Sequence, residues 1–437
     1  MTAILSAPDD FLDEPPRVLN TPRLIAWGGY ATLLLVAPLI FNSGASISFL
    51  SQLGTLIIFC LSYNMLLGQG GMLSFGHAVY AGLGAYFAIH TMNWAAKGPF
   101  QVPVSLIPLV GGIAGLCFGV LLGYVTTKKS GTTFAMITMG IGELVFAFSQ
   151  MFPKFFGGEG GITTNRSYGE AFLGITFGPQ IQVYYLIVAW LLACTAAIYA
   201  FTQTPLGRIL NAVRDNAERA EFIGYDTRIV RYMTLVISAF FAGVSGGLAA
   251  INFEIVSAES VSAIRSGDGL LFTFIGGVGS FAGPIVGAIA GGFLTVKLSD
   301  YTMAWQLYLG VFFILFVMYA PAGLVGMIKA NWRVLHAGRF GSVLPKWLAV
   351  VCAALVILGG SVILVELAYA FTFGAQKAAA AKFLAALSGA AHAALWATGA
   401  TLCVAGGLWF RRGRQRFLAT WETVNAEIDR AQAKAAA

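Results

Sequence analysis

The segment 66–86, LLGQGGMLSFGHAVYAGLGAY, places polar groups and glycines between two apolar stretches. Gln69, Ser74 and His77 carry amide, hydroxyl and imidazole groups, and Asn64 lies about one helical turn before them. Each glycine weakens a helix by about 1 kcal/mol relative to alanine, so unwound or closely packed backbone is expected here. Unwound backbone with polar side chains inside a membrane is typical of a path for a polar solute. The predicted path residues are Asn64, Gly68, Gln69, Gly70, Gly71, Ser74 and His77, and a tight helix-packing corner is the alternative.

A second glycine-rich stretch occurs at 268–296, where GGVGSFAGP interrupts a long apolar run. Proline and clustered glycines would break a straight helix at this point. We expect Gly276, Gly277 and Gly279 to form a second broken element of the path. Glycines also recur every fourth residue in two places, which indicates helices that pack closely on their neighbours. These glycines are Gly111, Gly115, Gly119 and Gly123, and Gly279, Gly283, Gly287 and Gly291.

The composition places these residues in a membrane protein. Of the 437 residues, 58% are hydrophobic and only 10% are charged, whereas a soluble domain has about 25% charged residues. The formal net charge of +7 comes from lysines and arginines in short loops between apolar runs. Such loops orient a membrane protein, so the charge indicates lipid surroundings and no nucleic-acid partner.

The sequence lacks the motifs of a membrane-embedded enzyme. It has neither HExxH nor GxSxG, and its histidines and cysteines are scattered without metal-ligand spacing. The stretch 123–130, GYVTTKKS, resembles a phosphate-binding loop, but Lys128 stands where that loop requires glycine. We therefore predict a transport subunit with no enzymatic activity, metal or cofactor of its own.

Apolar runs of about 20 residues, the length that crosses a bilayer, predict an all-α polytopic membrane protein. About eight spans form its core, the segment 268–296 forms a broken or re-entrant element, and two further spans follow. The predicted spans are roughly 24–42, 46–67, 76–93, 102–126, 132–152, 183–202, 230–251, 305–327, 347–372 and 383–410.

Lysines and arginines predict the orientation of these spans. They gather in 203–231, in 328–346, directly after the fourth span and in RRGRQR after the last span. All four clusters lie on the cytoplasmic side if 268–296 re-enters, and then both termini are cytoplasmic and 153–182 is the longest outer loop. The predicted domains are a cytoplasmic tail (1–23), a transmembrane domain (24–330) and an extension with two spans and a cytoplasmic tail (331–437).

The loop 203–231 is predicted to form an amphipathic helix around 208–224, closed by a glycine and a turn at Asp226. An ordered helix on the inner face of a pore protein needs a partner, and we expect its apolar stripe to enter a groove of that partner with charges at the rim. A helix lying on lipid headgroups is the alternative, but acids mixed among the arginines disfavour it. The residues predicted to contact this partner are Arg208, Arg214, Asp215, Glu218, Ala220 and Gly224.

Five blocks of the sequence resemble, in order, the M-type permease of the branched-chain amino-acid importers, an ABC transporter family. They are YNMLLGQGGMLSFGHAVYAGLGAY, GTTFAMITMGIGELVFAF, GGEGGIT, AVRDNAERAEFIGYD and FIGGVGSFAGPIVGA. The amphipathic loop also resembles the coupling helix of ABC importer permeases, although Arg219 stands where that motif has a second small residue. The resemblance runs from about residue 24 to residue 330 and stops beyond residue 335.

This resemblance implies half of a transmembrane channel for branched-chain or related amino acids in a bacterial inner membrane. An H-type homologous permease would form the other half, two cytoplasmic ATPase subunits using ATP and Mg²⁺ would drive transport, and a periplasmic solute-binding protein would deliver the solute. Specificity would rest mainly in that binding protein, so no deep, tight solute site is expected in this chain. Relatives in the family carry other amino acids, urea, amides or aromatic acids, so the solute itself stays open.

An ion-gradient-driven secondary transporter of small polar solutes is the alternative. It would need inverted repeats and a relay of charged intramembrane groups, and the core spans show only Glu143 in the middle of an apolar run. A carboxylate in hydrocarbon is costly, so Glu143 should be protonated, paired or facing a wet cavity. Glu366, in the extension, is interpreted as a hydrogen-bonded group that joins two helices.

Overall fold

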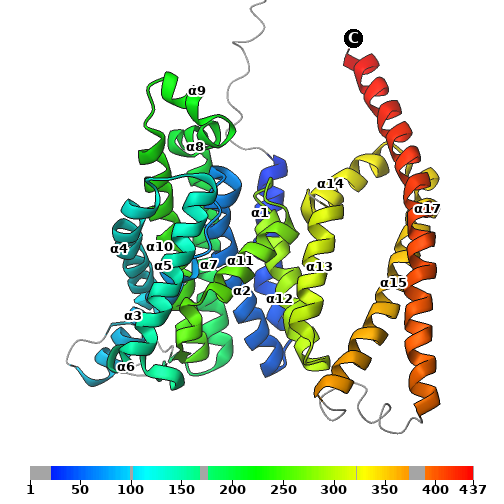
Figure 1. Cartoon of the computed structure of the whole chain (residues 1–437). Helices are drawn as coiled ribbons and strands as arrows, with labels where there is room; N and C mark the ends of the chain where they lie inside the picture. The colour runs from blue at the N-terminus through cyan, green and yellow to red at the C-terminus, as the bar shows by residue number, and fades with distance from the viewer. Residues whose placement is uncertain (1–20, 99–101, 168–175, 321, 374–388, 437) are drawn as a thin grey trace, which may run out of the picture.

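The computed structural model describes residues 21–98, 102–167, 176–320, 322–373 and 389–436, and its architecture is almost entirely helical (Figure 1). The N-terminal half contains α1 (Thr21–Ile40), α2 (Gly44–Asn64), η2 (Met65–Gln69), α3 (Ala78–Lys97), η3 (Val104–Leu106), α4 (Ile107–Thr126), α5 (Gly131–Met151), α6 (Pro153–Phe156), η4 (Gly158–Gly160), β1 (Ile162–Thr163), α7 (Gln180–Gln203), α8 (Pro205–Asp215) and α9 (Ala217–Phe222). The C-terminal half contains α10 (Thr227–Phe253), β2 (Ile255–Val256), η5 (Ala258–Val261), α11 (Ala263–Gly276), α12 (Gly283–Tyr301), α13 (Trp305–Tyr319), α14 (Gly323–His336), α15 (Phe340–Phe373) and α17 (Gly389–Ala436). Most of the predicted N-terminal tail lies outside the described residues.

Seven described helices are long and apolar enough to cross a membrane, or eight if α13 and α14 form one bent span. The chain is therefore an all-α, multi-pass membrane protein, as the sequence predicts. The seven are Gly44–Gln69, Val104–Thr126, Gly131–Met151, Gln180–Gln203, Thr227–Phe253, Gly341–Tyr369 and His392–Arg430. Three of the ten predicted spans differ. The apolar part of α1 is the shorter helix Leu24–Ile40, α3 is a helix that is not among the seven, and the 305–327 span is bent by 45° where α13 meets α14.

Helices α3, α4 and α10 form the centre of the fold, and glycine lets their backbones touch. A Cβ atom placed on Gly111 would lie 2.6 Å from the carbonyl oxygen of Gly243, closer than real Cβ atoms come. Gly115 meets the carbonyl of Ala239 in the same way, and Gly246 meets that of Ala81 on α3. The predicted glycine ridge on α4 therefore packs against α10.

Helices α11 and α12 replace a straight span with two helices that fold back on one another. Gly276 near the end of α11 contacts Gly283 at the start of α12, and Phe272 one turn earlier contacts Gly287 and Gly291. At about 1.5 Å per residue, the 14 residues of α11 are shorter than the ~30 Å hydrocarbon core of a bilayer. The stretch 268–296 is therefore broken into two helices, as the sequence predicts, with its apex at residues 277–282.

Different helices lie at the two ends of the molecule (Figure 1). Helices α8 and α9, the outer part of α14 and the C-terminal end of α17 lie at one end, whereas α6 lies at the opposite end. The strands β1 and β2 form one antiparallel pair that ties the segment after α6 to the end of α10. The basic loops 203–231 and 328–346 thus share one end, as the charge pattern predicts.

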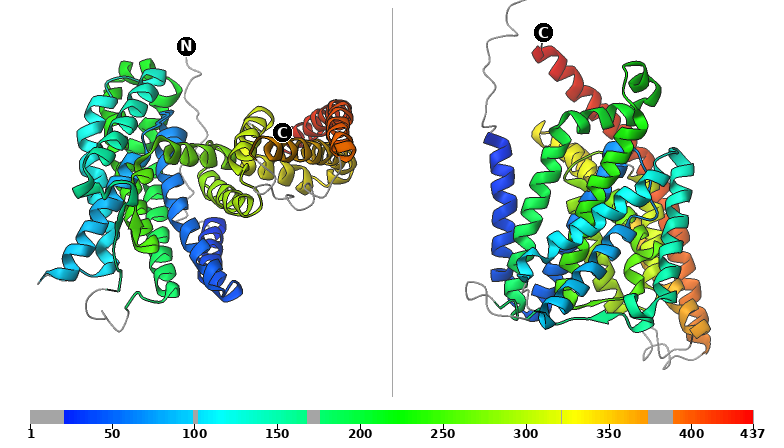
Figure 2. Two further views of the ribbon diagram at one scale, coloured as in Figure 1. Left: turned by 60° about the horizontal axis from the view of Figure 1, so that its bottom comes forward. Right: turned by 90° about the vertical axis from the view of Figure 1, so that its left-hand side faces the viewer.

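The C-terminal extension is a hairpin of α15 and α17 that lies beside the main bundle (Figure 2). It is attached at two levels. Thr302 and Tyr308 donate hydrogen bonds of 2.6 and 3.1 Å to Glu366, so this carboxylate joins α15 to the α12–α13 region as predicted. Near the other end, α17 packs on α14 through an apolar cluster and the ion pair Arg333–Asp429, at 3.2 Å. The predicted C-terminal tail is thus a continuation of α17.

Candidate functional site

The segment between α2 and α3 loses α-helical structure at the glycines, as expected. Residues Met65–Gln69 form a π-helix, η2, and helical structure resumes at Ala78. Gly71 has φ +62°, which glycine adopts without strain. A π-helical turn inside a span is frequent at functional sites. The break between α2 and α3 therefore exists where the polar residues cluster.

The second break lies directly against the first. A Cβ atom on Gly68 would come within 2.6 Å of the carbonyl oxygen of Val278, in the apex between α11 and α12. Gly277, with φ +110°, contacts the backbone at Ala322 and Gly323, where α14 begins. The structure thus brings the two predicted glycine-rich elements together at one junction. Gly279, in contrast, has open space around it.

Helix α8 forms hydrogen bonds with this junction. The guanidinium of Arg214 donates a hydrogen bond of 2.5 Å to the carbonyl oxygen of Gly68, and the amide of Asn211 donates one of 2.9 Å to the side-chain oxygen of Gln69. Gly70 and Gly71 face the side chains of Leu210 and Arg214. The predicted path residues Gly68 to Gly71 are therefore in contact with the predicted coupling helix.

The remaining polar residues of the first break are buried inside the bundle. His77 is fully buried, with its Nε2 atom 3.0 Å from the hydroxyl of Ser62, and its ring is surrounded by Phe59, Tyr63 and Tyr80. The hydroxyl of Tyr63 donates a 2.5 Å hydrogen bond to the carbonyl of Ser74. Within the described residues, Asn64 Oδ1, Ser74 Oγ and His77 Nδ1 are buried without a hydrogen-bond partner. Such atoms cost about 1–3 kcal/mol each, so this turn is a polar, energetically costly part of the core.

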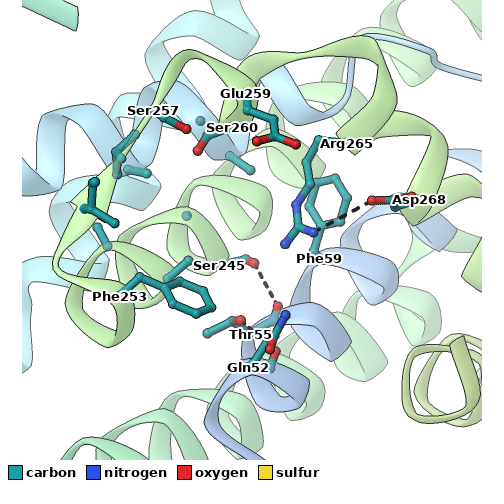
Figure 3. Close-up of a pocket in the computed structure, with 18 of the residues that line it drawn as sticks. Gln52, Thr55, Phe59, Ser245, Phe253, Ser257, Glu259, Ser260, Arg265 and Asp268 are labelled. Atoms are coloured by element: carbon teal, nitrogen blue, oxygen red, sulfur yellow. Dashed lines mark hydrogen bonds and ion pairs between the residues drawn. The ribbon is translucent and has the colours of Figure 1, made fainter. Parts of the chain in front are cut away.

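A cavity of about 300 Å³ opens on the other side of the bundle, between α2, α3, α10, η5 and α11 (Figure 3). Its lining includes Phe253, at the end of α10 that is farthest from α8 and α9, and Val256 in the following strand β2. This volume is at the lower end of the ~300–1,000 Å³ range of small-molecule pockets. None of the predicted path residues lines this cavity, so the cavity was not predicted from the sequence.

Three charged side chains meet at this cavity (Figure 3). Arg265 projects from α11 into the space, and its Nη1 atom lies 3.9 Å from a carboxylate oxygen of Asp268 one turn along the helix. Glu259 on η5 lines the same side. In the sequence, these three charged residues lie together in the stretch ESVSAIRSGDG at 259–269. Only Glu143 and Glu366 were interpreted as intramembrane charges, although this stretch overlaps the start of the apolar run 268–296.

The predicted coupling helix is two helices, α8 and α9, because Asn216 leaves the helical conformation and its side chain caps α9 at the N–H of Arg219, at 2.9 Å. Most of the apolar stripe is not free for a partner, since Val213 and Ala220 are buried against the chain itself, as is Leu210 beside them. Only its end, at Ile223, is exposed. This corrects the expected docking face. The apolar side chains exposed at the tip are Phe222 and Ile223, at 90% and 71%.

The end of α9 follows the predicted glycine turn. Gly224 has φ +98°, and the N–H of Tyr225 donates to the carbonyl of Ala220, at 3.2 Å, across the turn. This is the Schellman arrangement, in which a left-handed residue closes the helix. Asp226 then caps α10 at the N–H groups of Arg228 and Ile229. The charges around the turn are exposed, except that Arg214 pairs with Asp215 at 2.9 Å as well as contacting Gly68.

Comparison with known proteins decides the family. A family model described as the permease component of the branched-chain amino acid transport system matches residues 46–321. The chain belongs to this permease family. The matched residues run from α2 to the start of the α13–α14 bend, so they include both breaks, the cavity and the α8–α9 pair. The extension lies outside them.

Curated relatives of this permease agree on transport and differ in the solute that their names give. It is 26% identical over 306 residues to the high-affinity branched-chain amino acid permease LivM of Escherichia coli K12, covering 65% of this chain and 71% of LivM. It is 20% identical to the branched-chain amino acid permease BraD of Pseudomonas aeruginosa, covering 54% of this chain and 79% of BraD. The galactofuranose permease YtfT of Escherichia coli K12 is 28% identical, over 55% of this chain and 66% of YtfT. No solved structure matches.

Glu143 occupies an unexpected place in this permease. It lies in the middle of α5 on an exposed face, and it makes no hydrogen bond or ion pair with any residue that the structure describes. Gly140, one turn earlier, also has open space around it. The face of α5 that bears these two residues is thus free of contacts with the rest of the described chain.

Proposed function

We propose that this permease is one half of the transmembrane path of an ATP-driven importer for branched-chain amino acids in a bacterial inner membrane. The observation that carries the proposal is the hydrogen bond from Arg214 on α8 to Gly68 in the π-helix. It joins a helix pair at one end of the molecule to the junction of the two broken elements. A force applied to α8 and α9 thus reaches the junction directly, without passing through a flexible linker.

The motor is expected on other chains. The tip of the α8–α9 pair exposes Phe222 and Ile223, and these apolar side chains fit a groove on a cytoplasmic ATPase subunit that binds ATP and Mg²⁺. The charged residues Arg208 and Glu218 would lie around this contact. In this proposal α8, α9 and both termini lie in the cytoplasm, and the α6 end faces the periplasm, where a solute-binding protein would dock.

The exposed face of α5 is the surface proposed for the H-type homologous permease. A charged side chain in the middle of a span costs about 2.5–3.5 kcal/mol on insertion scales, so a protein surface is a better neighbour for Glu143 than lipid. The open space at Gly140 lets a second helix approach closely, which is how membrane helices associate. A second permease would complete a channel that this chain forms only in part.

Purification and reconstitution test this proposal. A tagged permease isolated from its native membrane should carry two ATPase subunits and a second permease. Vesicles containing that complex should take up radiolabelled L-leucine only with ATP on the motor side and the binding protein on the other. Uptake that needs no ATPase subunit and follows a proton or sodium gradient would instead establish a secondary transporter, the alternative that the family assignment disfavours.

A further inference from the structure

The cavity beside α11 offers hydrogen-bond donors that the protein leaves free. The Nη1 atom of Arg265 lies 3.9 Å from Asp268, beyond the 2.7–3.2 Å of a hydrogen bond. Among the described residues, no other group accepts from this guanidinium, although it carries five N–H donors. The two side chains are 39% and 28% exposed, so both can be reached from the cavity.

We propose that this cavity binds the charged head of a zwitterionic amino acid during its passage through the protein. The guanidinium of Arg265 binds the carboxylate, and Asp268 with Glu259 binds the ammonium group. The proposal rests on the proposed function, because it assigns a transit site to the solute of that importer.

The chemistry of the three groups matches such a head. A planar guanidinium pairs with a carboxylate through two parallel hydrogen bonds. The two acidic side chains repel a solute that carries only negative charge, and they attract the ammonium group. A neutral sugar would leave all three charges without a charged partner.

The rest of the cavity suits a small aliphatic side chain. Phe59, Phe253 and Val256 line it together with several alanines. Gln52 and Thr55 add polar groups on the α2 side (Figure 3). The site is therefore charged on the α11 side, and apolar and neutral polar groups share the rest of its lining.

The location of the charged pair explains how the solute could be released. Arg265 and Asp268 lie in the first half of α11, and the other end of α11 is the apex that touches Gly68. A movement of α8 that shifts the apex also tilts this short helix and separates the pair from the cavity walls. The solute site thus lies at one end of α11, and the apex that contacts Gly68, the residue bound by α8, lies at the other.

Reconstituted vesicles with the complete complex and its binding protein provide the test. Arg265→Gln should lower L-leucine uptake per assembled complex by about 10- to 100-fold, the usual effect of losing a hydrogen bond to a charged group. Arg265→Lys keeps the positive charge but loses the planar guanidinium that pairs with a carboxylate through two hydrogen bonds. Its L-leucine uptake should lie between that of Arg265→Gln and that of the wild type. Complex yield and ATPase stimulation by the loaded binding protein should stay near wild type in both variants.

A matched control is available on α12. Lys297 and Asp300 have the same spacing in sequence and the same 3.9 Å separation but lie outside the cavity. Lys297→Gln should therefore leave uptake unchanged. Ala249→Phe fills the cavity without changing any charge, and should lower uptake even if the Arg265 variants fail to assemble.

Two results would overturn the transit site. One is wild-type uptake by both Arg265→Gln and Ala249→Phe. The other is loss of ATPase stimulation in step with loss of uptake, because that pattern indicates a coupling defect. Failure of the wild-type complex to take up L-leucine with ATP would instead contradict the proposed function itself.

Discussion

Two arginines hold the ends of helices at their unpaired carbonyl groups. Arg214 binds the carbonyl of Gly68 in the π-helix. Arg166, only 9% exposed, donates to the carbonyls of Ile251 and Asn252, both at 3.3 Å, where α10 ends. The last carbonyls of a helix have no partner within it, so a forked guanidinium suits this position. Arg214 thus secures the junction beside α8, and Arg166 secures the end of α10 next to the cavity.

Replacing Arg214 should uncouple transport from ATP hydrolysis. Arg214→Ala leaves the Gly68 carbonyl unpaired and removes the link between α8 and η2, so uptake per complex should fall by about tenfold or more. Arg208→Ala serves as the control: Arg208 is a rim charge on the same helix whose side chain bonds to no described residue. Because a rim charge is worth only about 0–1 kcal/mol, this change should alter uptake little. The measurement is the ratio of leucine uptake to ATP hydrolysed in vesicles. An equal ratio of uptake to ATP hydrolysis in the two variants would show that the contact between Arg214 and Gly68 does not couple ATP hydrolysis to transport.

The turn at Gly224 should tolerate no branched side chain. Its φ of +98° strains any β-branched residue, by roughly 1–2 kcal/mol, although no atom crowds the position. Gly224→Val should therefore redirect the exposed tip and reduce ATPase binding in pull-down experiments. Gly338→Val carries similar strain, with φ +70° and open space, but lies between α14 and α15. Loss of ATPase binding in both variants would mean that strain alone, wherever it lies, disturbs assembly.

Sequence reasoning predicted backbone-determined residues better than side-chain partners. Gly224 was expected to close a helix because only backbone geometry is involved. Arg214 was expected at the rim of a partner and instead binds Gly68, because helical spacing shows which face a residue shares but not what that face meets. Arg265 was missed for the same reason, since its cavity brings α2 and α3 against the stretch from α10 to α11, far along the sequence.

At the scale of helices, apolar length predicted most spans and glycine spacing predicted where helices touch. The break between α8 and α9 was not predicted, although the Asn216-to-Arg219 spacing is a helix-capping signal. The amphipathic pattern there was read as a partner face. In the structure the apolar residues cover the chain's own bundle, because Leu210 packs near the first break. An amphipathic pattern does not distinguish an intramolecular from an intermolecular contact.

Two glycine substitutions should separate folding from assembly. Gly243→Leu inserts a side chain where α10 touches the α4 backbone, so the chain itself should fail to accumulate in the membrane. Gly140→Leu meets no atom of this chain, so it should accumulate normally but lose the second permease. Membrane levels by immunoblotting and co-purification of the second permease measure the two effects. Normal co-purification with Gly140→Leu would remove α5 from the proposed interface.

At the scale of the whole molecule, the basic loops gather at one end and the short β-pair lies near the other. Ser167 is exposed next to the β-pair, and Arg339 is exposed between α14 and α15. Single cysteines introduced by Ser167→Cys and Arg339→Cys, in a chain freed of its five cysteines, should report opposite sides. In intact cells permeable only at the outer membrane, an impermeant maleimide should label position 167 alone. Labelling at position 339 alone would invert the proposed orientation.

The 48 residues of α17 make it about 72 Å long at 1.5 Å per residue, more than twice the ~30 Å hydrocarbon core of a bilayer. Its final turns therefore stand well clear of the lipid, and they lie apart from the α8–α9 tip (Figure 1). A purification tag or fluorophore fused after the last residue of α17 would therefore be held away from the α8–α9 tip, where a motor would bind. The C-terminal side of the molecule is thus the natural place for a handle that leaves transport undisturbed.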